Sequence, residues 1–285
     1  MNLRAETSGP ATDRTRFYIA AIARRVEEEA GLLLSPARHP MIEARLRRRL
    51  ARLNLRSYRD YLRLIDGPGG AAERAALLGL LTTHVSHFFR EPHHFGMMRD
   101  RLLPPLIADA RAGRRLRFWS AGSAAGQEAY SLALTLLDLA PDAARLDLQI
   151  LATDLDATQT ARATRAVYPT AALAEIPHRH RHHCHSLSDG FTLSDEVRRL
   201  VRCRTANLHG DWRADQGFDA ILCRNVLIYF EPRARERLLE RFTAAMADGG
   251  WLLLGHAERL TGPAVSRLSA IGQTIYSRND MRAEE

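Results

Sequence analysis

The chain has 285 residues, of which 46% are hydrophobic and 26% are charged, and this balance excludes a largely disordered protein. Its net charge of +8 indicates an acidic partner or substrate. All 41 basic residues are arginine, which excludes chemistry that depends on lysine, such as Schiff bases or a P-loop lysine. No apolar run approaches the roughly 20 residues that cross a bilayer, and residues 1–15 lack the apolar core of a secretory signal.

The three cysteines lie far apart in the chain and form no Cys-x-x-Cys pair. Cys184, Cys203 and Cys223 therefore offer no framework for disulfides or structural zinc, and their odd number fits a reducing compartment. We expect a cytoplasmic protein that does not insert into a membrane.

Residues 1–85 are predicted to form a helical N-terminal domain. Ser35-Pro36 is a typical helix start and predicts a helix that runs to about Asn54, and Ser57 predicts the cap of another. The buried stripe expected on the first of these helices consists of Ile42, Leu46, Leu50 and Leu53. Arginines occupy its other faces and predict a basic surface: Arg45, Arg48, Arg49, Arg52 and Arg56.

From Arg115 onward, short apolar strands alternate with helices, which predicts a mainly parallel α/β sheet covered by helices. The expected strands are 116–120, 148–153, 218–223 and 251–254. The expected helices begin at about Gln127, Ala157 and Pro232. The run 273–276 could form an antiparallel strand at the end of the sheet.

Three features follow the ends of predicted strands, where open α/β sheets bind their ligands. The small-residue loop 120–126 lets backbone approach a ligand, although tight strand–helix packing favours the same composition. Asp154 is placed to accept hydrogen bonds from two ribose hydroxyls, or to cap the next helix, as Asp156 also could. Asn225 could bind a polar ligand group or simply form a turn. Together these features indicate a nucleoside cofactor.

Longer motifs around these positions resemble the signatures of the CheR family, the chemotaxis protein-glutamate O-methyltransferases. In family order they are TTHVSHFFRE at 82–91, WSAGSAAGQEAYS at 119–131, ATDLD at 152–156, FDAILCRNVLIYF at 218–230, GHAE at 255–258 and GQTIY at 272–276. The similarity runs from about Phe17 to Arg278.

The resemblance implies a class I, Rossmann-like methyltransferase sheet in a catalytic domain of residues 86–285, with a small β-subdomain inserted at 178–205. It also implies S-adenosylmethionine as cofactor, S-adenosylhomocysteine as product, and glutamate side chains of chemoreceptors as methyl acceptors. By matching motifs, the residues expected at the cofactor are His84, Ser86, Arg90, Gly122, Glu128, Asp154, Asn207, Leu208, Asn225 and Val226.

Five positions depart from the family pattern. His84 and Ser86 stand where the family usually has Asn and Thr, Gln127 stands where it usually has Glu, and Ala124 and Ala125 stand where it usually has Ser/Thr-type residues. The first two changes keep the capacity to hydrogen-bond but alter side-chain size. We expect a divergent but competent site.

The reaction that the resemblance implies fits the residues available. A carboxylate is already ionised near neutral pH, so its methylation needs no general base, metal or covalent intermediate. The protein has to position the reactants and exclude water, and positioning alone can supply about 7–11 kcal/mol. We expect Arg90 to orient the acceptor carboxylate and Tyr229 to shape the transfer pocket, although Tyr229 could instead be a core aromatic residue.

The basic helix is the expected docking surface. In the family the N-terminal domain contacts the receptor, and an arginine-rich face suits an acidic helical bundle, although a solvated charged face has the same composition. The residues expected to dock are Arg45, Arg48, Arg49 and Arg52. We expect the protein to act as a monomer.

The run HRHRHHCH at 178–185 suggests metal binding, but its arginines would repel a cation and no carboxylate pair lies nearby in the sequence. In some family members the matching subdomain binds a peptide at the receptor's C-terminus. The sequence leaves peptide tethering and adventitious metal binding open here. We predict no metal site.

Two other functions remain open. A nucleic-acid methyltransferase would explain the charge, but enzymes that methylate exocyclic base amines typically place Asn/Asp-Pro-Pro-aromatic where this chain has 225–228. Nucleic acid is therefore not an expected partner. A non-catalytic adaptor that binds the cofactor would explain the changes at His84, Ser86 and Gln127.

Overall fold

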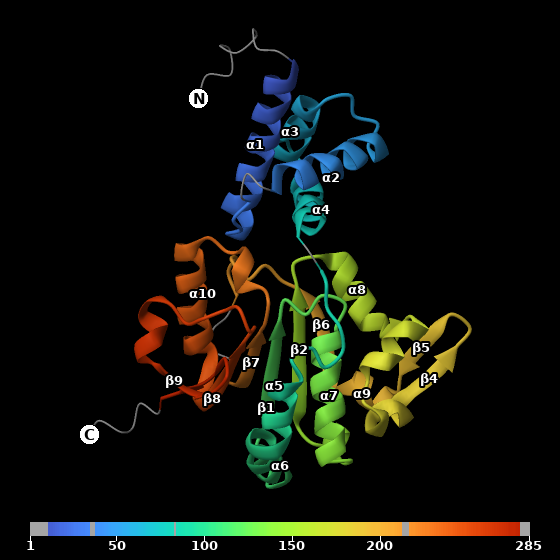
Figure 1. Cartoon of the computed structure of the whole chain (residues 1–285), viewed down its shortest axis with the longest axis vertical. Helices are drawn as coiled ribbons and strands as arrows, with labels where there is room; N and C mark the ends of the chain where they lie inside the picture. Colours follow the sequence, from blue (N-terminus) through green and yellow to red (C-terminus); the bar gives the residue numbers. More distant parts are fainter. Residues whose placement is uncertain (1–10, 35–37, 83, 213–216, 280–285) are drawn as a thin grey trace. The chain divides into compact units, whose positions relative to one another are not determined.

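The computed structural model describes residues 11–34, 38–82, 84–212 and 217–279. Contacts between residues divide the chain into a helical unit, Met1–Thr82, and a larger unit, Thr83–Glu285 (Figure 1). The sequence predicts a boundary at residue 85. None of the described helices combines the length and apolar character that a membrane span requires.

The helical unit contains α1 (Ala11–Ala30), α2 (His39–Arg52), α3 (Tyr58–Asp66) and α4 (Ala71–Leu81). The predicted start at Ser35-Pro36 lies outside the described residues, and α2 begins at His39 with a proline in its first turn. The predicted cap of α3 is confirmed, because Ser57 Oγ accepts a hydrogen bond from the Asp60 N–H at 3.2 Å.

The predicted apolar stripe of α2 is largely confirmed. Ile42, Leu46 and Leu50 are buried. Leu53 is half-buried because the helix has already ended at Arg52. Side chains at positions i, i+4 and i+8 lie on one face of a helix, so these three form the seam that faces the rest of the helical unit.

The larger unit is built on a seven-stranded sheet in the order β6-β2-β1-β7-β8-β10-β9. Its strands are β1 (Leu116–Ala121), β2 (Leu148–Asp154), β6 (Val201–Thr205), β7 (Phe218–Cys223), β8 (Met246–Leu254), β9 (Leu268–Gly272) and β10 (Ile275–Arg278). The first five in the sheet order pair in parallel, whereas β10 is antiparallel to both of its neighbours. The predicted parallel sheet and its antiparallel final strand are therefore confirmed.

Alternating side chains of β1 reach the two faces of this sheet. Leu116 and Phe118 belong to the core cluster that includes the buried residues of α7 (Gln127–Leu139). Trp119 instead packs edge-on against Phe242 of α10 (Pro232–Ala245), with ring centroids 5.3 Å apart. The helices therefore cover both faces and leave the strand ends as the accessible edge.

The segment before the sheet is also helical, which the sequence did not predict. It consists of α5 (Pro92–Met97), a π-helical turn (Met98–Leu102) and α6 (Leu103–Arg111). Phe95, Met98 and Leu103 are buried in the same core cluster as α7.

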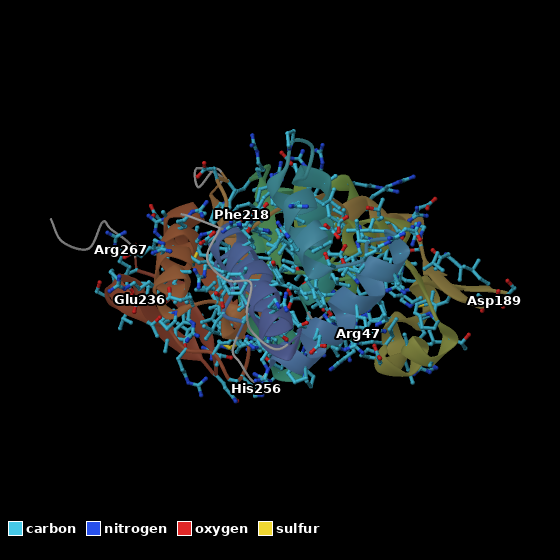
Figure 2. All side chains as sticks on the ribbon, turned by 90° about the horizontal axis from the view of Figure 1, so that it is seen from above. Arg47, Asp189, Phe218, Glu236, His256 and Arg267 are labelled. Carbon is cyan, nitrogen blue, oxygen red and sulfur yellow. The ribbon has the colours of Figure 1, made fainter. Side chains whose placement is uncertain are left out.

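A second, three-stranded sheet has the order β3-β5-β4. It is formed by β3 (Val167–Tyr168), β4 (Cys184–Leu187) and β5 (Gly190–Leu193), and Asp189 lies at the tip of its hairpin (Figure 2). The β-subdomain was expected at residues 178–205, and the observed small sheet differs from that range in two ways. The small sheet already begins at Val167, and β6 pairs with β2 in the large sheet, because its alternate residues pack against the core there. Two further helices complete the unit, α8 (Ala157–Arg165) and α9 (Asp195–Leu200).

Candidate functional site

The carboxyl ends of five neighbouring strands form one edge of the large sheet. Chain order reverses between β1 and β7, so this edge is the crevice where open α/β sheets bind ligands. The predicted residues that end or directly follow these strands are Gly122, Asp154, Asn207, Leu208, Asn225 and Val226. The fold thus brings together residues that lie up to a hundred positions apart in the sequence.

Gly122 allows the loop after β1 to touch the loop after β7. Its φ is +82°, and a Cβ atom at this position would lie 2.5 Å from Val226 Cγ2. Any side chain here would push the two loops apart. The small-residue loop therefore serves close approach between two segments of the site.

Asp154 is almost fully buried, with 7% of its surface exposed. Its Oδ2 accepts a hydrogen bond from the Ala124 N–H at 2.8 Å, and its Oδ1 accepts one from the Asp156 N–H at 3.0 Å. Burial raises the pKa of the Asp154 carboxyl, and these hydrogen bonds and the nearby His84 oppose that shift. His84 Nε2 lies 3.6 Å from Asp154 Oδ1.

The two acidic residues after β2 have different roles. Asp156 caps α8 by accepting a hydrogen bond from the Thr158 N–H at 2.7 Å. Asp154 makes no such cap, so its carboxylate is held at the mouth of the crevice by the backbone of two loops. Asp156, and not Asp154, is therefore the residue that caps α8.

Glu258 holds the loop after β7, a role that was not predicted from the sequence. Its Oε1 accepts a hydrogen bond from the Val226 N–H at 2.8 Å, and its Oε2 accepts them from the N–H groups of Asn225 and Gly255 at 2.9 and 2.6 Å. The side chain is 3% exposed. One buried carboxylate therefore fixes the ends of β7 and β8 together, and Asn225 is held at a φ of +61°.

Glu128, predicted at the cofactor, has protein partners for both oxygens. Ser120 Oγ donates to Oε1 at 2.7 Å, and Arg224 Nη1 donates to Oε2 at 3.2 Å. Burial raises the pKa of Glu128, while Arg224 opposes the shift. Arg224 also lies 3.3 Å from Glu91 and donates to the carbonyl oxygen of Arg90, so its guanidinium ties the segment before α5 to the sheet.

The structure places the predicted catalytic side chains on two segments beside this network. Arg90 is half-buried, and its Nη1 donates to the carbonyl oxygen of Val85 at 3.1 Å. Tyr229 is half-buried in the 3-10 turn Leu227–Tyr229, which follows the loop held by Glu258. Ser86 is half-buried on the same segment as Arg90.

Polar atoms in the crevice fit a nucleoside cofactor. Ser123 Oγ and Asn225 Oδ1 are buried and have no hydrogen-bond partner among the described residues. Buried polar atoms are rarely left without a partner, because this costs about 1–3 kcal/mol. Both lie in loops that border Gly122, so a ligand with hydroxyl and amino groups would satisfy them.

Backbone strain also concentrates at this edge. Phe89, Glu91, Ala124 and Asn225 all have φ between +48° and +61°, a region that residues other than glycine rarely adopt. Such residues cluster at functional sites, where the surrounding structure holds them in place. All four border the loops described above.

The arginines predicted to dock a partner separate into two kinds. Arg45 Nη1 donates to the carbonyl oxygens of Leu80 and Thr82 at 2.6 and 2.8 Å, and Arg49 Nη2 pairs with Glu73 Oε2 at 2.6 Å. Both arginines therefore stabilise contacts inside the helical unit. The other two predicted docking residues, Arg48 and Arg52, are exposed.

Glu73 is half-buried in the helical unit, where it pairs with Arg49 and Tyr61. Burial alone would raise its pKa, but hydrogen bonds from Arg49 and from the Tyr61 hydroxyl outweigh burial and lower it. Burial and the neighbouring Glu73 raise the pKa of Tyr61. The interaction joins α2, α3 and α4.

The histidine run lies in the 3-10 segment His178–His183 and the start of β4. His180 is buried and stacks on Phe89, with ring centroids 5.1 Å apart. Burial lowers the pKa of His180 to about 4, so the ring is neutral at neutral pH. A hollow of about 510 Å³ nearby is lined by Leu137, Pro141, His182, His183, His185, Ser194 and Glu196.

The strand order, the single antiparallel strand and the acidic residue that ends β2 define a class I methyltransferase. Comparison with known proteins agrees. Residues 84–276 match the SAM-binding domain of CheR methyltransferases, and residues 19–82 match the all-alpha domain of CheR methyltransferases. The chain belongs to the CheR methyltransferase family and is an S-adenosylmethionine-dependent methyltransferase.

Individual relatives cover most of the chain. A probable chemotaxis protein methyltransferase of Rhizobium etli is 39% identical over 256 residues, which make up 88% of this chain and 96% of that protein. A chemotaxis protein methyltransferase of Vibrio parahaemolyticus is 34% identical over 84% of this chain and 88% of its own length. Chemotaxis protein methyltransferase 2 of Pseudomonas aeruginosa is 33% identical over 92% of this chain and 93% of its own length.

Proposed function

We propose that this protein transfers the methyl group of S-adenosylmethionine to glutamate side chains of chemoreceptors in the cytoplasm, forming methyl esters for chemosensory adaptation. The observation that carries the proposal is the buried carboxylate of Asp154 at the end of β2, beside the unpartnered atoms Ser123 Oγ and Asn225 Oδ1. The family and the names of the relatives support chemotaxis as the setting.

The cofactor would lie across the carboxyl ends of the strands. The Asp154 carboxylate would accept hydrogen bonds from its ribose hydroxyls, and Gly122 would let it approach the backbone. The remaining residues proposed to line it are His84, Ser86, Arg90, Glu128, Asn207, Leu208, Asn225 and Val226. When bound, S-adenosylmethionine supplies an electrophilic methyl group.

Glu128 would contribute to the cofactor site indirectly. Its carboxylate holds Arg224, and Arg224 holds the carbonyl oxygen of Arg90. A shift of this chain of contacts would move the segment that carries Arg90 and Ser86. We therefore propose Glu128 as a positioning residue.

The acceptor glutamate needs no base, because its carboxylate is ionised near neutral pH. The Arg90 guanidinium would orient it, and the Tyr229 ring would help to exclude water from the transfer pocket. Charge is neutralised as the reaction proceeds, so a pocket with little water favours it. The hydrogen bonds of Glu258 and Arg224 would hold the neighbouring loops in position for the reaction.

Docking to the receptor would use the exposed arginines of α2. Arg45 and Arg49 bond to other groups within the helical unit. Arg48 and Arg52 are exposed, so we assign docking to these two arginines. The small sheet offers a second contact. Its edge strand β4 pairs only with β5, so its other edge could add a receptor C-terminal peptide as a further strand.

The decisive test is a methyl-transfer assay with tritiated cofactor and cytoplasmic receptor fragments. We expect label in base-labile ester on glutamates, and loss of that label in Asp154→Ala. Glu196→Ala, an exposed change away from the crevice, is the control. Tight cofactor binding without transfer to any receptor fragment would favour a non-catalytic adaptor, and label on nucleic acid would refute the proposed acceptor.

A further inference from the structure

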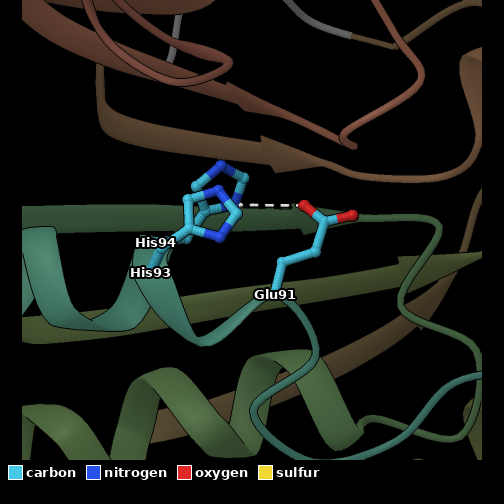
Figure 3. A group of neighbouring side chains, drawn as sticks. All are labelled: Glu91, His93 and His94. Atoms are coloured by element: carbon cyan, nitrogen blue, oxygen red, sulfur yellow. Dashed lines mark ion pairs between the residues drawn. The ribbon is translucent and has the colours of Figure 1, made fainter.

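Three side chains at the start of α5 converge on one point. Glu91, His93 and His94 each offer a ligand atom, and these atoms lie within 4.8 Å of one another (Figure 3). Glu91 precedes the helix with a φ of +55°. This unusual backbone conformation accompanies a carboxylate that faces the two imidazoles instead of solvent.

His94 is oriented as a metal ligand would be. Its ring is completely buried, and its Nε2 lies 3.1 Å from the carbonyl oxygen of Gln273 and 3.0 Å from Thr274 Oγ1. A carbonyl oxygen can only accept, so Nε2 carries the hydrogen and Nδ1 presents a lone pair. In metal sites the second ring nitrogen of a ligating histidine commonly donates to a carbonyl in this way.

That lone pair has nothing to bind. His94 Nδ1 has no hydrogen-bond partner among the described residues, and it lies 3.5 Å from Glu91 Oε2, whose other charged neighbour is Arg224 Nη2 at 3.3 Å. Two acceptors thus face each other in a buried place. A cation between them would turn this unfavourable contact into two ligand bonds.

The balance of charge around this point favours a bound cation. Arg224 is the one buried guanidinium in this network of described residues, and it pairs with both Glu91 and Glu128 at 3.3 and 3.2 Å. Glu258 is buried close by, but its oxygens accept hydrogen bonds from backbone N–H groups. Two carboxylates, Glu91 and Glu128, therefore share one arginine, so a divalent cation would balance the remaining negative charge.

We propose that Glu91, His93 and His94 bind Zn²⁺, as a structural ion that lies beside the cofactor crevice and takes no part in the methyl-transfer step. Two imidazoles and one carboxylate form a ligand set that zinc favours and that calcium and magnesium do not. A fourth ligand can come from water, or from His256, whose Nδ1 lies 3.0 Å from the other oxygen of Glu91. His93 and His256 are exposed, which gives the ion a path of entry.

The test is calorimetric titration of the full, tag-free chain with ZnCl₂. We expect binding of one ion, and Co²⁺ in its place should give the absorption bands of a tetrahedral N/O site. His93→Ala should weaken binding at least about tenfold, because loss of a ligand costs no less than loss of a supporting contact. His93 is exposed, so this variant should fold.

Two controls separate the site from others on the chain. His87→Ala removes an exposed histidine on the same segment and should leave binding unchanged. A triple variant, His182→Ala, His183→Ala and His185→Ala, removes the histidines around the hollow and should also retain the ion. The proposal fails if His93→Ala binds zinc like the wild type, or if the triple variant abolishes binding. Neither readout depends on methyl transfer.

Discussion

Charged residues act differently in the two units of the chain. In the larger unit Arg224 and Glu258 are buried and Glu128 is half-buried, and their bonds hold the loops at the carboxyl edge of the sheet. On α2 of the helical unit, Arg48 and Arg52 are exposed to solvent. A buried charge with several partners fixes a loop, because leaving it unpaired is costly, whereas an exposed one is available to meet another molecule. Position, and not the number of arginines, separates these roles.

The largest effect should come from removing the carboxylate that joins the ends of β7 and β8. Glu258→Ala leaves the N–H groups of Asn225, Val226 and Gly255 without their acceptor. We expect the free energy of unfolding to fall by about 3 kcal/mol or more, with cofactor affinity lost as well. Denaturant unfolding and calorimetry measure the two, and Glu196→Ala is the exposed control. An unchanged free energy of unfolding would contradict the inference that buried charges hold loops in place whereas exposed charges do not.

A smaller effect is expected at Asp154, which we propose to bind the cofactor. Hydrogen bonds to a charged group contribute about 1.5–3 kcal/mol, so Asp154→Asn should weaken S-adenosylmethionine binding about tenfold to a hundredfold. Calorimetric titration measures this. An affinity equal to that of the wild type would remove Asp154 from the cofactor site.

If Asp154 binds the cofactor as proposed, cofactor binding should be sensitive to pH. Burial raises the pKa of Asp154, and a protonated carboxyl has lost its charge as an acceptor. Affinity should therefore fall as the pH drops through this raised pKa, at a higher pH than an ordinary aspartate would require. Asp154→Asn should show no such loss, and an identical pH profile in the variant would contradict the assignment.

In the helical unit the half-buried pair of Arg49 and Glu73 should matter for stability. Arg49→Met removes the partner of a carboxylate that is mostly buried, and we expect a loss of about 1–2 kcal/mol. Because the folded-state pKa of Glu73 is lowered, its stabilising effect is present above the usual carboxylate pKa and is lost as the pH falls through the lowered value. Thermal unfolding of the variant should therefore show a weaker dependence on acid than that of the wild type.

The smallest effect on stability is expected for the exposed arginines. Arg48→Ala with Arg52→Ala should change the free energy of unfolding by less than about 0.5 kcal/mol. Receptor methylation at low salt should slow about two- to fivefold, and the difference should shrink at high salt, because exposed charges mainly speed association. Initial methylation rates at two salt concentrations measure this. An equal loss at both would argue against electrostatic docking.

Local patterns were enough to predict most of the large sheet. The strand 218–223 and the helix that begins at Gln127 have the expected bounds, because apolar runs and flanking small residues define them. The start of the small sheet at Val167 was missed, since a strand of two residues leaves almost no pattern. The helical segment from Pro92 to Arg111 was also missed.

The candidate site was predictable only in part. Strand-end positions such as Asp154 and Asn225 follow from the alternation of strands and helices. The role of Glu258 could not be read from the sequence, because it depends on backbone N–H groups some thirty residues away in the chain. The same holds for Arg49, which differs from Arg48 only in what α4 places beside it.

The left-handed conformations of Phe89, Glu91, Ala124 and Asn225 have a consequence for how the cofactor arrives. In a protein with flexible loops, such conformations would form only when a ligand binds. Ordering the loops would then reduce the binding free energy. Here hydrogen bonds from within the chain already impose them at Ala124 and Asn225. The loops around the crevice are therefore already in place before the cofactor arrives. The rate of cofactor binding should depend on diffusion and shape complementarity more than on rearrangement of the protein.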